Sequence, residues 1–265
     1  MYSAILAAMV FCPPPCDTAA EAAKTFSTPR FTLHIGATRT SDLGASPYVE
    51  GVADESLRVL NDTYDELTRI FETRPNQRVI LRFLTPEEFH DTTGSPSWTS
   101  AMYFGGEITV PVKLEDARSA RHLKRALRHE YVHAVIAELS GSRCPAWFDE
   151  GLAQLIEGEA NPLLGPALRN WIRHHQPLPL DSLQNGFTLI DDALVPTAYA
   201  QSLFATRTLV NTYGFRSVRK YLKLLRESEP EPEAFRAAFQ LSRETFERQL
   251  DTQITRWASS TNPHP

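Results

Sequence analysis

His129-Glu130-Tyr131-Val132-His133 places two histidines four residues apart, with a glutamate between them. On a helix, histidines at this spacing project from the same face, one turn apart. That geometry suits a tetrahedral zinc ion, whose ligands converge from one side at about 2 Å. Glu130 lies three residues before His133, so its longer side chain can lean over the metal without ligating it and can take a proton from a water molecule. The stretch therefore predicts a helix that carries a zinc site, with Glu130 as general base.

A third ligand is needed, and Glu150 is the best candidate, within Trp147-Phe148-Asp149-Glu150-Gly151-Leu152-Ala153. Gly141 is a natural left-handed cap for the end of the histidine helix. Pro145 is typical of the first residue of a second helix. Glu150 then falls in the opening turns of that helix, and an antiparallel packing would carry it back to the histidines. The prediction is one Zn²⁺ per chain, held by His129, His133 and Glu150.

The two motifs together, His-Glu-x-x-His and Trp-x-x-Glu-Gly-x-Ala, resemble those of the gluzincin metallopeptidases, the group that contains thermolysin and the aminopeptidase N-like enzymes. They look most similar to the compact bacterial peptidase MA-like proteins. The resemblance is specific over residues 106–157 and diffuse over residues 190–250. It implies the same three zinc ligands and the same general base. It also implies that the chain hydrolyses peptide bonds in a peptide or protein substrate.

Two positions decide against the other large zincin group, whose third histidine and glycine would fall at Leu139 and Ile136. One position departs from the thermolysin-like pattern. Those proteins carry an acidic residue four positions after the glutamate ligand, and here that residue is Gln154. Asp149 is a candidate to take its place.

The resemblance implies roles for two further residues. Many gluzincins supply a tyrosine or histidine downstream of the glutamate ligand to donate a hydrogen bond to the developing oxyanion, and Tyr199 is the candidate here. The alternative is a core tyrosine whose hydroxyl bonds a backbone carbonyl. In the aminopeptidase-like members a glutamate near the edge strand holds the substrate's amino group, and Glu107 stands at a comparable place. Its alternative is a solvated strand residue.

Residues 30–113 carry the patterns of a small α/β subdomain. Strand-like runs occur at residues 31–35 and 79–84, and residues 52–73 have the apolar stripe of a helix. Residues 102–112 predict a glycine turn followed by a strand. In gluzincins a strand in this place is the sheet edge that borders the cleft and pairs with the substrate backbone. A plain structural strand is the alternative.

Residues 114–260 are predicted to be mostly helical, beginning with the histidine helix at residues 114–140. The chain is therefore expected to have an α+β fold, with a small mixed β-sheet followed by a helical zinc-binding and C-terminal subdomain. The resemblance implies a zincin-like arrangement, with the His-Glu-x-x-His helix at the cleft.

The N-terminus resembles the apolar core of a secretory signal, although no basic residue precedes residues 3–11. That run is too short to span a bilayer, so no stable membrane span is expected. Residues 1–22 are predicted to be a leader, cleaved within residues 18–22, and the protein is expected to be exported to the periplasm or the cell exterior. Cleavage would leave Cys144 as the single cysteine.

Composition describes an ordinary globular protein of 265 residues, 42% apolar and 22% charged. A net charge of −5 argues against a general nucleic-acid binder, because phosphate neutralisation needs a basic excess. Nothing in the sequence indicates an oligomeric state. Two other function classes stay open: a zinc-stabilised but catalytically inactive peptide-binding protein, and a metal-free helical interaction module.

Overall fold

A computed structural model describes residues 24–36, 43, 47–94, 99–112, 119–158, 161–187 and 190–260. The predicted leader, residues 1–22, lies outside this part of the chain. The chain divides into two compact units, residues 1–135 and 136–265. The subdomain boundary expected between residues 113 and 114 stays a prediction.

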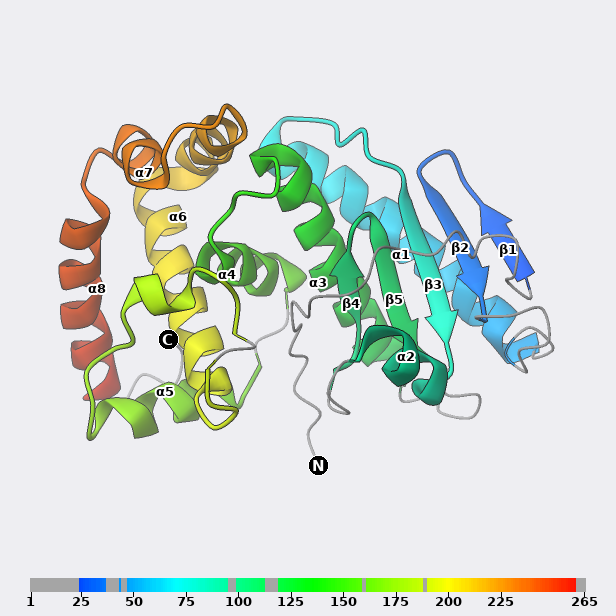
Figure 1. Cartoon of the computed structure of the whole chain (residues 1–265), viewed down its shortest axis with the longest axis horizontal. Coiled ribbons are helices and arrows are strands. Elements are labelled where there is room, and N and C mark those ends of the chain that lie inside the picture. The colour runs from blue at the N-terminus through cyan, green and yellow to red at the C-terminus, as the bar shows by residue number, and fades with distance from the viewer. Residues whose placement is uncertain are drawn as a thin grey trace. The chain divides into compact units, whose positions relative to one another are not determined.

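The first unit holds a five-stranded mixed sheet with the order β1-β2-β3-β5-β4 (Figure 1). Strand β2 pairs with β3, and β3 with β5, in parallel, whereas β1 and β4 run antiparallel at the two edges. The small mixed sheet predicted from the sequence is therefore confirmed. The strands are β1 (Lys24–Ser27), β2 (Phe31–Ile35), β3 (Val79–Leu84), β4 (Met102–Phe104) and β5 (Glu107–Pro111).

The prediction that the strand before the histidine helix forms the sheet edge is wrong. Strand β5, directly before the histidine helix, is interior, and the edge next to it is the short strand β4. Gly105 and Gly106 both have positive φ, 57° and 93°, and they join β4 to β5 in a two-residue hairpin. Such turns need two consecutive residues in this region, which glycine adopts without strain. The glycines thus lie between two strands rather than ahead of one.

Helices cover both faces of the sheet. Helix α1 (Pro47–Phe71) lies behind it in Figure 1, and α2 (Pro86–Thr93) lies in front. Helix α2 begins with a capping box, in which Thr85 and Glu88 bond each other's backbone amides, and it buries Phe89 beside Leu84 and Met102. On the opposite face, Phe31 packs edge-on against Tyr131, at 5.2 Å between ring centroids. Tyr131 thereby ties the histidine helix to the sheet.

Helix α3 (Ser119–Ser140) carries the histidines; it begins in the first unit and ends in the second. The second unit is mostly helical, as predicted. Its helices are α4 (Ala146–Glu157), α5 (Leu164–Ile172), the short 3₁₀ helix η3 (Leu180–Leu183), α6 (Val195–Arg226), α7 (Glu231–Phe239) and α8 (Arg243–Ala258).

Helix α6 is two helices joined at Gly214, whose φ of 71° and ψ of 168° are not helical. The sequence predicts a helix that ends at residues 213–214 and another from residue 217, so the break is where it was expected. Beyond it, Tyr221 packs against Phe148, Phe235 and Phe239. None of the helices in the described ranges combines the length and apolar character needed to cross a membrane.

Candidate metal centre

The two histidines lie on one face of helix α3. His129 and His133 are buried, and their ring centroids are 4.8 Å apart. Helix α3 ends where the sequence predicts, at Gly141, which has a φ of 63°. The Ser142 amide then donates to the Ala137 carbonyl and closes the last turn.

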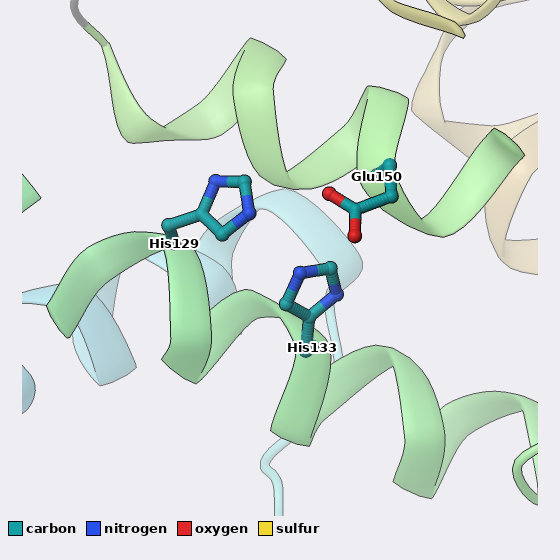
Figure 2. A group of neighbouring side chains, drawn as sticks. All are labelled: His129, His133 and Glu150. Atoms are coloured by element: carbon teal, nitrogen blue, oxygen red, sulfur yellow. The ribbon is translucent and has the colours of Figure 1, made fainter. Parts of the chain in front are cut away.

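Helix α4 begins one residue later than expected, because Pro145 is its N-cap rather than its first helical residue. The connection is nevertheless short, and it places Glu150 in the second turn of α4. The Glu150 side chain is buried and points toward the two histidines (Figure 2). One ligand atom from each of His129, His133 and Glu150 lies within 4.8 Å of the other two.

These three donors fit a zinc ion. Two imidazole nitrogens and one carboxylate oxygen are ligands that Zn²⁺ prefers, and three protein ligands leave the fourth tetrahedral position open, as catalytic zinc sites require. All three residues are buried. The chemistry of the donor set and its convergence therefore both suit the metal that the sequence predicts.

Glu130 is fully buried and lies outside the ligand group. Its Oε2 atom accepts a hydrogen bond from the backbone amide of Tyr103, at 2.7 Å. Tyr103 is the middle residue of edge strand β4, so the edge strand fixes the orientation of this carboxylate. Tyr103 could not be identified from the sequence, because its contribution comes from the main chain and not from its side chain.

Tyr199 lies in the second turn of α6, and its side chain is buried. Its hydroxyl donates to Glu150 Oε1 at 3.4 Å, and its ring packs edge-on against Phe187. The alternative prediction was a hydrogen bond from this hydroxyl to a backbone carbonyl, whereas the hydroxyl donates to a carboxylate oxygen of the candidate metal site.

Gln154 occupies the position where thermolysin-like proteins carry an acid. Its Nε2 atom donates to the backbone carbonyls of Glu150 and Tyr199, both at 3.1 Å. Gln154 therefore bonds main-chain atoms on two helices. Asp149 is buried in the first turn of α4, and its suggested substitution for the missing acid stays a prediction.

Glu107 forms an ion pair with Arg82. Arg82 donates from Nε to Glu107 Oε1 at 2.7 Å and from Nη2 to Oε2 at 3.0 Å. Only 7% of the Arg82 side chain and 18% of the Glu107 side chain are exposed. The alternative of a solvated strand residue is therefore wrong, and the Glu107 carboxylate already pairs with a cation.

Known proteins similar to this chain are found among the solved structures. No curated protein matches the chain significantly. Among solved structures, it is similar to a mutant of a two-domain M1 zinc metallopeptidase bound to L-arginine, with 17% identity and a TM-score of 0.41 over 92% of this chain and 52% of that one. It is also similar to a mutant M1 zinc metallopeptidase from Deinococcus radiodurans bound to a Tyr-Ser-Ala substrate, with 17% identity and a TM-score of 0.40 over 92% of this chain and 54% of that one. The chain thus spans about half the length of these structures.

The family assignment rests on the sequence itself. Residues 72–256 match the Peptidase MA superfamily. The matched region covers well over half of the chain and includes both motifs of the candidate metal centre. This chain therefore belongs to the Peptidase MA superfamily.

Proposed function

We propose that this protein is a zinc-dependent peptidase of the gluzincin type, with one zinc per chain held by His129, His133 and Glu150. The observation that carries the proposal is the convergence of three buried ligand atoms within 4.8 Å of one another. When bound, zinc supplies Lewis acidity, which lowers the pKa of a water molecule towards about 7 and polarises a carbonyl group.

Glu130 has the role of general base in this proposal. It accepts a proton from the attacking water and later delivers that proton to the leaving amine. The hydrogen bond from the Tyr103 amide to Oε2 prepares the carboxylate for this role, because it fixes the side chain before substrate arrives. A base that is already oriented loses little conformational entropy during the reaction.

Tyr199 is proposed to stabilise the oxyanion that develops on the scissile carbonyl. Its hydroxyl is a hydrogen-bond donor, and it lies 3.4 Å from an oxygen of the ligand Glu150. A hydrogen bond from a buried donor stabilises a developing negative charge more than one from a solvated donor, because the surrounding dielectric constant is low. The proposed substrates are peptides or proteins, in keeping with the superfamily.

The test compares the wild-type protein with Glu130→Gln on a proteome-derived peptide library, with zinc content measured for both. The substitution keeps the ligands and removes the base, so zinc should stay while cleavage falls by orders of magnitude. Glu138→Gln is the matched control, since it removes a carboxylate two turns along the same helix. A wild-type protein that holds zinc but cleaves no peptide would support a zinc-stabilised binding protein instead. A protein that holds no zinc would support the metal-free interaction module.

A further inference from the structure

Helices α4 and α6 approach each other very closely beside the candidate metal site. A Cβ atom built on Gly151 would lie 2.1 Å from Thr206 Oγ1 and 2.4 Å from the Ser202 backbone carbonyl. Real Cβ atoms do not come so near another heavy atom, and one of these two atoms belongs to the main chain of α6. Only glycine therefore permits this spacing, and it occurs at the residue next to Glu150.

Gln154 bonds across the same helix pair, one turn further along α4. Its side-chain amide contacts two carbonyl oxygens, Glu150 O and Tyr199 O, each at 3.1 Å. Since carbonyls only accept hydrogen bonds, the amino end of the amide must face them. With 8% of the residue exposed, water competes little for these bonds.

The two residues bridged by Gln154 are also joined through their side chains, because the Tyr199 hydroxyl donates to Glu150 Oε1. We propose that Gln154 is a positioning residue that holds the Tyr199 main chain against the Glu150 main chain, so that the Tyr199 hydroxyl reaches the ligand carboxylate. This inference rests on the proposed function, which makes Glu150 a zinc ligand and Tyr199 a hydrogen-bond donor in the reaction.

The inference explains why an amide stands where thermolysin-like proteins have an acid. An ionised carboxylate has no proton to donate, and beside two carbonyl oxygens it would meet only acceptors. A glutamine has the two N–H groups that the two carbonyls need. Gln154 therefore stabilises the contact between α4 and α6, because it bonds the main chains of Glu150 and Tyr199.

Gln201 provides a matched control. It is a fully buried glutamine on α6, two residues after Tyr199, and it also makes two backbone hydrogen bonds. Its Oε1 accepts from the Leu178 amide at 2.8 Å, and its Nε2 donates to the Leu178 carbonyl at 2.5 Å. Replacing Gln201 likewise removes two backbone hydrogen bonds of a buried glutamine, but the bonds lost join α6 to the segment that contains Leu178.

The experiment measures zinc dissociation constants by chelator competition, together with kcat and KM, for five proteins: wild type, Gln154→Met, Tyr199→Phe, the double variant and Gln201→Met. Methionine keeps the length of glutamine and removes its hydrogen bonds. Each single change at Gln154 or Tyr199 should raise the zinc dissociation constant about tenfold, the range of residues that orient metal ligands. The zinc dissociation constant of the double variant should be no higher than that of the single variant with the higher value, because both substitutions act through the Tyr199 hydroxyl. Gln201→Met should leave the dissociation constant within about twofold.

Losses that multiply in the double variant, or an equal loss in Gln201→Met, would overturn the positioning role while zinc binding by the wild type keeps the proposed function intact. Absence of zinc from the wild type would overturn the proposed function, and this inference with it. Gln154→Glu covers a failure of Gln154→Met to fold. It keeps the size of the side chain but, when ionised, has no hydrogen to donate to the two carbonyls, so a wild-type zinc affinity in this variant would also overturn the role.

Discussion

Arg82 donates to both carboxylate oxygens of Glu107, at 2.7 and 3.0 Å, in a largely buried pair. A two-point pair of this kind is among the strongest side-chain interactions, and it leaves the carboxylate poorly suited to bind a second cation. Glu107 is therefore a poor anchor for the free amino group of a substrate, although the sequence made it a candidate.

We predict that an N-terminally acetylated peptide is cleaved as well as the same peptide with a free amine, with kcat/KM values within about threefold. The measurement is a paired assay on one sequence, cut at the same internal bond. A strong preference for the free amine that disappears in Glu107→Gln would restore the amine-binding role.

Replacing Gly151 by alanine should destabilise the protein by about 1–3 kcal/mol or more, because the added methyl group forces α4 away from α6. Gly51→Ala is the matched control, since Gly51 also lies in a helix but has open space where its Cβ would stand. That change should stabilise by up to about 1 kcal/mol through helix propensity. Denaturant unfolding of both variants measures the difference, and two equal effects would mean that the helix contact is not tight.

Tyr199→Phe should retain stoichiometric zinc under zinc excess, while kcat falls about a hundredfold with little change in KM, since the lost bond matters most in the transition state. Tyr221→Phe is the matched control. Tyr221 is also a buried tyrosine with its hydroxyl on a glutamate, Glu231, at 2.7 Å. Its loss should lower stability but leave kcat near wild type. A wild-type kcat in Tyr199→Phe would return Tyr199 to a structural role.

Stability should depend on pH through Glu231. Burial raises the pKa of this carboxyl, and the hydrogen bond from Tyr221 and the charge of Arg243 oppose the rise only in part. The folded protein therefore binds the proton more readily than the unfolded chain, so stability is lost as pH rises through the folded pKa. Glu231→Gln should raise Tm at about pH 7–8 and change it little at about pH 4. A lower Tm for this variant at the higher pH would show that the ion pair with Arg243 outweighs burial.

Removing zinc should lower the melting temperature. A metal that binds only the folded state adds about 4 kcal/mol when its free concentration is a thousand times its dissociation constant. Chelation should therefore destabilise the wild type, and zinc should no longer raise the Tm of His129→Ala, His133→Ala or Glu150→Ala. Glu150→Ala with undiminished zinc content would remove Glu150 from the ligand set.

The candidate metal site could be anticipated because its signals are local. Two histidines one helical turn apart, a glycine cap and a short connection are all contained in residues 129–150, and the structure brings the three expected ligand atoms within 4.8 Å of one another. The break at Gly214 was equally local.

What the sequence could not give depends on contacts between distant residues. The Tyr103 amide lies 27 positions from Glu130, and the Gln154 side chain reaches Tyr199, 45 positions away. The hairpin at Gly105 and Gly106 was missed for another reason, because β4 is a strand of three residues and is too short to show an alternating pattern.

The hydrogen bond that holds Glu130 comes from the main chain of Tyr103, and every amino acid except proline has the required N–H group. The edge strand can therefore vary in side chain at this position while the proposed base keeps its main-chain partner. Tyr103→Pro is the single substitution at this position that removes the anchor.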